Sequence, residues 1–344
     1  MKTQNCVVVA GSECLLSKKI SELIDSKVIV LEKNSFADSE IAIQFDGDAE
    51  YIRGKTVLLV QQFSFDEIRS NGINSINDQL TRFLLLSHQI KAYGARRIIA
   101  VLPYLPYIRQ SRSFCGTYVG PLEVLGRFFK SAGVDRVVSC DLHEALCHSL
   151  FSIPIYEMKL ADFWKQQLGY VLNNDDIRHI CFISPDRGGI NRVKEMAYTY
   201  GVDWAFVEKK RINRNKSQSI DVIGNVRDKI AVIIDDIIDS GDTAVGACNL
   251  LIERGVRRVV GCFSHAIFSG NAIQKIERSG FEKIIVSNSI LSQNMDLSKK
   301  IIIASLDKVL SSFVQKVTIK DMLASAEKVP WQKNCTTEIK SEQL

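Results

Sequence analysis

The chain of 344 residues is 46% hydrophobic and 24% charged, an ordinary globular composition, and it is long enough for two domains. Lys and Arg exceed Asp and Glu by a formal charge of only +5, a mild excess that does not demand a nucleic-acid partner. No apolar run is long enough to span a bilayer, and the N-terminal apolar segment is too short for a secretory signal. We therefore expect no nucleic-acid partner and no membrane partner.

The nine cysteines show neither the CxxC spacing of redox and metal sites nor a ligand-like spacing relative to the five histidines. Reduced, mostly buried thiols are typical of a cytoplasmic protein. The cysteine pattern therefore favours a cytoplasmic location.

Short apolar runs rich in β-branched residues alternate with longer amphipathic stretches along most of the chain. Strands are predicted at residues 6–10, 28–31, 56–60, 98–102, 137–140, 180–184, 231–235, 259–262 and 283–287. Continuous apolar strands that alternate with helices are typical of parallel sheets covered on both faces. We therefore predict an α/β fold of mostly parallel sheets flanked by helices.

Three of the predicted strands are preceded by a similar short sequence motif, which begins at Gly94, Gly133 and Gly255. A helix that ends at a left-handed glycine, followed by one polar turn and a buried strand, explains the motif. A helix is also predicted at residues 243–254, where Val245 and Cys248 belong to one apolar face.

The same alternation is present on both sides of residue 158, with Pro154 in the region where the chain crosses over. We predict two similar α/β domains, at residues 1–158 and 159–320. The alternation fades after residue 317, and residues 336–344 are polar, so residues 321–344 are predicted to form a frayed tail.

The most informative motif follows the predicted strand at 231–235, at the end of a strand where open α/β sheets bind ligands. An acidic pair is followed by a loop with hydroxyl groups that leads into a helix, and the backbone N–H groups there could bind a monophosphate. The acidic pair could accept hydrogen bonds from vicinal ribose hydroxyls. Simple helix capping is the alternative, but it leaves the acidic residues unexplained. The predicted sugar-phosphate residues are Asp235, Asp236, Asp239, Ser240, Gly241, Asp242 and Thr243.

This loop resembles the phosphoribosyl-diphosphate-binding loop shared by phosphoribosyltransferases and ribose-phosphate pyrophosphokinases. The segments at 104–112 and 36–40 resemble the nucleotide-binding segments of the second family, and arginine suits phosphate because it makes bidentate contacts. The resemblance implies that the second segment reaches the site of a neighbouring subunit. The ATP-binding residues it implies are Phe36, Asp38, Ser39, Glu40, Arg109, Gln110 and Arg112.

Two further segments resemble the magnesium-binding segments of that family, and they place His143 and Asp186 at the ligand positions. Chemistry alone would make His143 a buried or catalytic histidine, because Mg²⁺ prefers oxygen ligands. The resemblance therefore carries its assignment as a ligand of the expected cofactor, Mg²⁺. Residues 264–270 match another family segment, in which we expect His265 to be structural.

The basic segment at 207–216 resembles the flexible catalytic loop of the family, with Lys209 and Arg211 at its functional positions and Arg211 also at the ribose 5-phosphate. Cations there would stabilise charge on the transferring phosphoryl group while a closing loop excludes water. A solvated basic loop, or a nucleic-acid phosphate contact, would be the alternative if the segment stood alone.

The ordered motifs cover nearly the whole chain and imply a phosphoribosyltransferase-like fold and a ribose-phosphate diphosphokinase. Such an enzyme converts ATP and ribose 5-phosphate to AMP and 5-phosphoribosyl 1-diphosphate for nucleotide biosynthesis. The resemblance further implies a homo-oligomer, at least a dimer and commonly a hexamer.

Three positions depart from the family pattern: Asp242 replaces a usual Gly, and Ser111 and Ser113 replace an Asp and a Lys. A carboxylate that faced a dianionic phosphate at contact distance would repel it. The departures leave open a catalytically weak regulatory homologue. A phosphoribosyltransferase would share the loop at 235–243 but would not explain Arg109 and Gln110.

Overall fold

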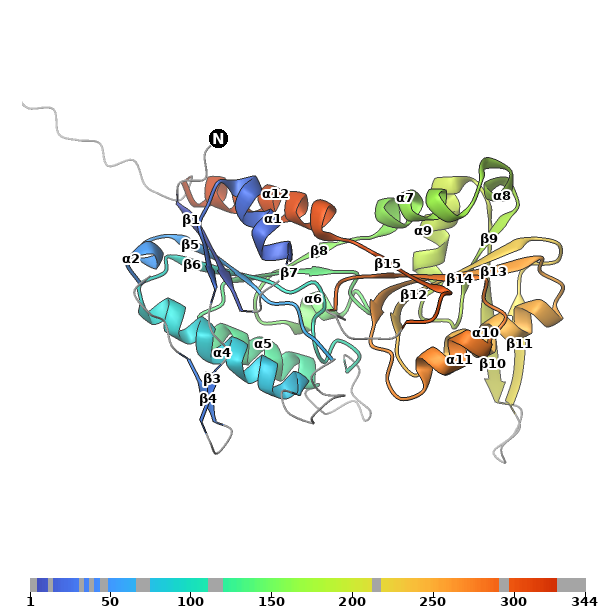
Figure 1. Ribbon diagram of the computed structural model, residues 1–344, viewed down its shortest axis with the longest axis horizontal. Helices are drawn as coiled ribbons and strands as arrows, with labels where there is room; N and C mark the ends of the chain where they lie inside the picture. The colour runs from blue at the N-terminus through green and yellow to red at the C-terminus, as the bar shows by residue number, and fades with distance from the viewer. Residues whose placement is uncertain are drawn as a thin grey trace, which may run out of the picture.

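The computed structural model describes residues 5–11, 15–30, 34–36, 40–43, 49–65, 75–110, 120–211, 218–290 and 297–326. These residues form two large sheets with helices on both faces, which Figure 1 shows next to each other. A short antiparallel pair, β3 (Asn34–Ser35) and β4 (Ile41–Ala42), projects from the N-terminal half. The prediction of an α/β fold with mostly parallel sheets is confirmed.

The N-terminal sheet is parallel throughout and has the order β2-β1-β5-β6-β7-β8. Its strands are β1 (Cys6–Ala10), β2 (Val28–Val30), β5 (Thr56–Val60), β6 (Arg97–Val101), β7 (Arg136–Cys140) and β8 (Ile155–Met158). The helices of this part are α1 (Leu15–Ile24), α2 (Ala49–Ile52), α4 (Ile76–Ala92), α5 (Pro121–Ser131) and α6 (Cys147–Leu150). The central strands are fully buried, as expected for apolar strands covered on both faces.

The C-terminal sheet has the order β11-β10-β9-β12-β13-β14-β15, and only β10 and β11 pair antiparallel. Its strands are β9 (Ile180–Ser184), β10 (Asp203–Arg211), β11 (Gln218–Ile223), β12 (Ile230–Ile238), β13 (Arg258–Ala266), β14 (Lys283–Ser287) and β15 (Ile301–Ala304). The remaining helices are α7 (Ala161–Val171), α8 (Asn174–Arg178), α9 (Ile190–Tyr200), α10 (Asp242–Glu253), α11 (Ala272–Arg278) and α12 (Asp307–Ala326).

All nine predicted strands are present, but β12 and β13 run several residues farther than the apolar pattern indicated. The extra residues pair with one another, as Ile237 does with His265. They were missed because Asp236 and Ser264 are polar and fall where the apolar runs were taken to end. The expected left-handed glycines are observed, with φ of 88° at Gly94 and 83° at Gly255.

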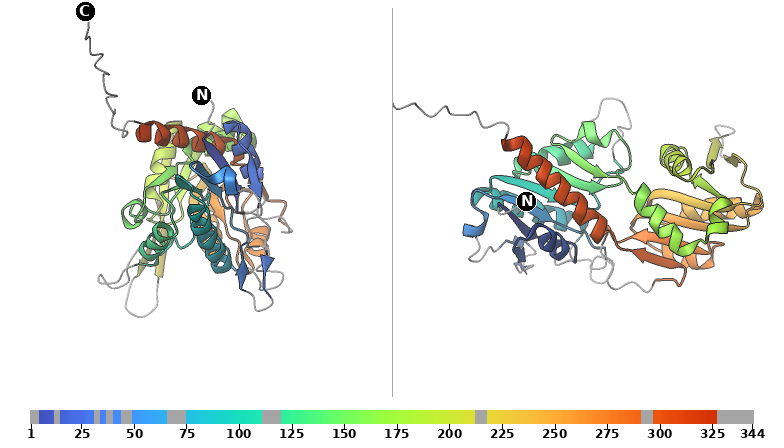
Figure 2. Two further views of the ribbon diagram at one scale, coloured as in Figure 1. Left: turned by 90° about the vertical axis from the view of Figure 1, so that its left-hand side faces the viewer. Right: turned by 90° about the horizontal axis from the view of Figure 1, so that it is seen from above.

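The last helix packs against the N-terminal part of the chain, which differs from the expectation that residues 159–320 form one domain. Helix α12 lies along α1 and also contacts β8, and Figure 2 shows it crossing above the N-terminal sheet. Leu310 and Val314 are fully buried there, and the side chain of Gln315 donates a hydrogen bond to the carbonyl of Leu23 at 2.9 Å. The helix also continues to residue 326, six residues into the predicted tail, and the division of the chain into domains stays a prediction.

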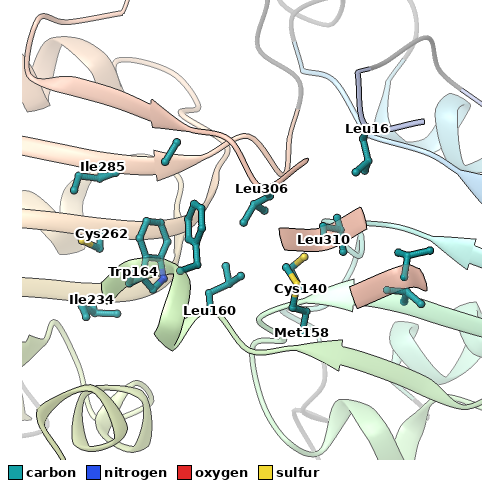
Figure 3. Packing of buried hydrophobic residues seen from close by; sticks show 14 of the residues in the cluster. Leu16, Cys140, Met158, Leu160, Trp164, Ile234, Cys262, Ile285, Leu306 and Leu310 are labelled. Carbon is teal, nitrogen blue, oxygen red and sulfur yellow. The ribbon is translucent and has the colours of Figure 1, made fainter. Parts of the chain in front are cut away.

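One hydrophobic core runs along both sheets on the face that α7, α9 and α12 cover. Leu160, Trp164 and Leu306 lie between the buried residues of the N-terminal sheet and those of the C-terminal sheet (Figure 3). This shared core holds the two sheets in a defined relation, which matters because the candidate site lies between them. No helix in the described part of the chain is both long enough and apolar enough to cross a membrane.

Candidate active site

A histidine and a carboxylate meet at the interface between the two sheets. His143 follows β7 and Asp236 lies in β12, and His143 Nδ1 is 2.8 Å from Asp236 Oδ2. The hydrogen bond to Asp236 raises the pKa of His143. Burial would raise the pKa of Asp236, but the bond to His143 and the charge of Arg192 hold it well below its ordinary value. Two predicted site residues that are 93 positions apart in the chain are thus directly paired.

Arg192, in the first turn of α9, is the cation around which the acidic residues gather. Its guanidinium lies 3.4 Å from Asp141, 3.3 Å from Asp235 and 3.4 Å from Asp236. Its side chain is only 17% exposed, so these interactions occur where solvent screening is weak. Burial would lower the pKa of Arg192, but the three carboxylates raise it, and the side chain stays charged.

Sequence reasoning missed this arginine. It follows the Gly188-Gly189 pair closely, and the structure shows why glycine is needed there: a Cβ at Gly189 would lie 2.6 Å from Ser184 Oγ and 3.5 Å from the Arg192 guanidinium. The glycine therefore lets the 184–189 loop approach the acidic cluster.

Asp141 connects the end of β7 to a buried polar network in the C-terminal part. The Ser264 hydroxyl donates to its carboxylate, and the His265 ring lies 3.4 Å from its carbonyl oxygen. The other ring nitrogen of His265 is 2.8 Å from Ser289 Oγ. Burial lowers the pKa of His265, so this histidine is neutral and structural, as expected.

The predicted sugar-phosphate loop forms the turn between β12 and α10. Gly241 has φ of 80°, a left-handed conformation that glycine adopts without strain, and it ends the loop at the helix N-terminus. The first backbone N–H groups of a helix have no partner within the helix, so the N–H groups of this loop are placed to bind an anion.

The carboxylate of Asp242 is turned toward α11. Its Oδ1 accepts a hydrogen bond from Lys275 Nζ at 2.6 Å, and its Oδ2 accepts the Ser240 hydroxyl at 2.9 Å. These two contacts lower the pKa of Asp242, that with Lys275 most. Lys275 was not predicted from the sequence, because 33 positions separate it from Asp242.

Arg109 connects the predicted ATP segment to the same loop. Arg109 lies in the 104–110 segment, which follows β6 of the N-terminal sheet. Its guanidinium is 2.6 Å from Asp239 Oδ2. The hydrogen bonds from Ser269 and Arg109 lower the pKa of Asp239 against the effect of burial. The two segments that the sequence assigned to different substrates are therefore in contact.

Comparison with known proteins identifies the family. The model described as the N-terminal domain of ribose phosphate pyrophosphokinase matches residues 6–124, and the phosphoribosyl synthetase-associated domain matches residues 203–325. A ribose-phosphate pyrophosphokinase of Aquifex aeolicus is 32% identical over 82% of this chain and 86% of that protein. A second, from Fusobacterium nucleatum, is 30% identical over 91% of this chain and 95% of that protein. The chain belongs to the ribose-phosphate pyrophosphokinase family.

A solved structure of this family supports the fold as well. The phosphoribosylpyrophosphate synthetase of Mycobacterium smegmatis superposes with a TM-score of 0.80 at 27% sequence identity. The match covers 92% of this chain and 99% of that one, so both sheets and the interface between them are included.

The other predicted ATP-binding residues are spread over several segments. Phe36, beside the β3–β4 pair, has 63% of its surface exposed, and Glu40 and Gln110 are also exposed. Asp38, Ser39 and Arg112 lie outside the described residues, as do the departures at Ser111 and Ser113. Among the described ATP-segment residues, Arg109 contacts the sugar-phosphate loop through Asp239, and the assignment of all these residues to ATP stays a prediction.

The predicted catalytic cations lie at the end of β10. Lys209 pairs with Ile220 and Arg211 with Gln218 on β11, so their backbone is in a strand rather than a loop. Residues 212–217, between these strands, lie outside the described part of the chain.

His143 and Asp186, the predicted magnesium ligands, are each oriented by a hydrogen bond. His143 Nδ1 is taken by Asp236, which leaves Nε2 for a metal, as is common for metal-bound histidines. Asp186 Oδ1 accepts the backbone N–H of Gly188 at 2.7 Å, which orients the carboxylate. The described residues contain no group of three or more side chains placed to hold a metal ion.

A cavity of about 370 Å³ adjoins His143 and Arg192 between the 141–146 segment and the first turns of α7 and α9. Lys159 and Trp164 contribute to its wall. Glu157 on β8 fixes one side of this segment, because its carboxylate accepts the backbone N–H of Leu142 at 2.8 Å.

Glu157→Gln is expected to lower the free energy of unfolding by about 1–2 kcal/mol at pH 7, since it removes a charged acceptor of several hydrogen bonds. Burial alone would raise the pKa of Glu157, but bonds from Lys159, His148 and the Leu142 N–H outweigh it and lower the pKa below 4.5. The carboxylate therefore stabilises the folded chain above pH 4.5, and this contribution is lost as the pH falls through the lower folded-state pKa.

Urea unfolding of both proteins at pH 7 and at progressively lower pH tests this prediction. The difference between wild type and variant should shrink on acidification. A difference that stays constant down to the acid transition would show that the charge of Glu157 is not what stabilises the segment.

Proposed function

We propose that this enzyme transfers the diphosphoryl group of Mg-ATP to the anomeric oxygen of ribose 5-phosphate, giving AMP and 5-phosphoribosyl 1-diphosphate. The observation that supports this best is the ion pair between Arg109 and Asp239, at 2.6 Å. It joins the segment assigned to ATP with the loop assigned to the sugar phosphate, and a reaction between the two substrates requires these segments to be adjacent.

In this proposal the protein acts mainly by positioning and by stabilising charge. The N–H groups at the start of α10 bind the 5-phosphate, and Asp235 and Asp236 orient the ribose hydroxyls. The anomeric hydroxyl attacks the β-phosphorus, the bond to the α-phosphate oxygen breaks, and AMP leaves. Lys209 and Arg211 stabilise the charge that develops on the transferring group, and no covalent enzyme intermediate is required.

His143 and Asp186 are the proposed ligands of Mg²⁺. When bound, the ion would neutralise charge on the ATP phosphate oxygens. The hydrogen bond from His143 Nδ1 to Asp236 would then orient the imidazole ring so that Nε2 faces the metal ion. Asp236 would also contact the sugar.

We further propose a cytoplasmic enzyme of nucleotide biosynthesis that works as a homo-oligomer, at least a dimer and commonly a hexamer. The exposed ring of Phe36 supports the homo-oligomer, because an aromatic side chain that stacks on adenine in a neighbouring subunit must project from the surface of its own subunit.

A catalytically weak regulatory homologue remains the second candidate, because Asp242 occupies a position that is usually Gly in the family. The contact from Lys275 weakens that case, since its ammonium on α11 offsets the charge of the carboxylate.

A direct assay distinguishes the two candidates. Protein, Mg-ATP and ribose 5-phosphate should give AMP and phosphoribosyl diphosphate in equal amounts, and Lys209→Ala should slow the reaction by about 10²–10³-fold. Absence of AMP at high concentrations of folded protein would leave the regulatory homologue as the better reading.

A further inference from the structure

Lys275 on α11 lies beside the sugar-phosphate loop and contacts it twice. Its ammonium is 2.6 Å from Asp242 Oδ1 and 3.2 Å from the carbonyl oxygen of Ser240. The start of α11 also lies beside the loop: a Cβ at Gly241 would be at ordinary contact distance, 3.7 Å, from the carbonyl oxygen of Ala272. Figure 1 shows α10 and α11 next to each other. The position of Lys275 is thus set by the packing of the helix that carries it.

Asp242 would otherwise oppose binding of a phosphate. Its backbone N–H belongs to the anion-binding turn at the start of α10. Its carboxylate is therefore near any dianionic ligand bound there, and like charges at short distance repel each other. Both carboxylate oxygens are engaged, Oδ1 by Lys275 and Oδ2 by the Ser240 hydroxyl. The pair of Lys275 and Asp242 has no net charge, and the carboxylate is held against α11.

We propose that Lys275 is a positioning residue for the phosphate of ribose 5-phosphate: it neutralises Asp242 and keeps that carboxylate turned away from the anion-binding N–H groups. This inference rests on the proposed function, because it assumes that the loop binds the 5-phosphate. With Asp242 neutralised by Lys275, this chain can bind the phosphate without the Gly that the family usually has at position 242. This pairing also makes the two residues interdependent, so that the cost of losing Lys275 depends on whether Asp242 is present.

A double-mutant cycle on the full chain tests this interdependence. Lys275→Ala should raise the KM for ribose 5-phosphate about tenfold, with kcat and the KM for ATP nearly unchanged, because the uncompensated charge opposes only the sugar phosphate. Lys275→Ala combined with Asp242→Gly should return the KM to within about threefold of wild type. Asp242→Gly alone should lower the KM, since the freed ammonium can then face the phosphate.

Three further variants separate this role from a structural one. Lys275→Arg should preserve the wild-type KM, and Lys275→Gln, which keeps a polar side chain without the charge, should reproduce the effect of the alanine if that variant folds poorly. Arg278→Ala removes a positive charge from the same helix at an exposed position and should leave the KM unchanged. An unaltered KM in both Lys275→Ala and Lys275→Gln would overturn the proposal, and so would a double variant that binds as weakly as Lys275→Ala.

Calorimetric titration of all variants with ribose 5-phosphate alone distinguishes failure of this inference from failure of the proposed function. If wild type binds the sugar phosphate but forms no AMP, the proposed reaction is wrong while the binding cycle still tests Lys275. If wild type is active and the cycle shows no coupling between the two positions, only the role of Lys275 is wrong.

Discussion

Arg192→Met is expected to lower the free energy of unfolding by about 3–5 kcal/mol, the usual cost of leaving buried charges without their partner. Arg192 lies within 3.5 Å of Asp141, Asp235 and Asp236, and its side chain is 17% exposed. Methionine fills much of the same volume, so the loss arises from the charge rather than from a cavity. The three carboxylates would have to move, take up protons or admit water.

Chemical unfolding at pH 7 measures this effect, with Arg178→Met as the matched control. Arg178 is on the short helix α8, and its side chain is 78% exposed, so its removal should change stability by less than about 0.5 kcal/mol. Arg192→Lys should recover part of the lost stability, because lysine restores the positive charge but not the several donors of the planar guanidinium. Equal stability of Arg192→Met and wild type would show that the acidic cluster does not depend on this cation.

Asp236→Asn is expected to reduce kcat/KM for ribose 5-phosphate by about 10³-fold, within the range for loss of a group that positions a substrate. The variant keeps the shape of the side chain but loses the charge that Arg192 and His143 both contact. The bond to Asp236 is also the main cause that raises the pKa of His143, so the histidine should titrate at a lower pH in the variant.

Steady-state kinetics with varied ribose 5-phosphate, together with NMR titration of His143, checks both parts of this prediction. Asp162→Asn is the control, because Asp162 is an exposed carboxylate on α7. A variant with near-normal kcat/KM would mean that Asp236 does not orient the sugar. A variant with low activity but an unchanged His143 pKa would separate the sugar contact from the histidine contact.

Local patterns were enough to predict the elements that lie within each sheet. The buried strands have continuous apolar runs, and the left-handed glycines at 94, 133 and 255 end helices where expected. The helix predicted at 243–254 is observed as α10, Asp242–Glu253. These predictions succeed because strand and helix periodicity are properties of short segments. β15 was missed because it is a short edge strand, and β8 because its residues are half polar.

The site was predictable only as a set of separate segments. His143, Asp186, Arg109 and the loop at 235–243 were found from their position after strands and from resemblance to a family. Their partners were not found, because Arg192, Glu157 and Lys275 carry no local sign of function. Sequence reasoning also left the orientation of Asp242 undecided, and it is the packing of α11 that brings Lys275 to that carboxylate.

The sequence by itself therefore determined the α/β class, the positions of the central buried strands and the residues that follow them. Only the tertiary structure decided that α12 returns to α1, that one arginine serves three carboxylates, and that Asp242 is neutralised by a lysine on another helix. The physical reason is that periodicity is written into neighbouring residues, whereas the pairing of charges depends on the order of strands in a sheet and on how the helices pack over it.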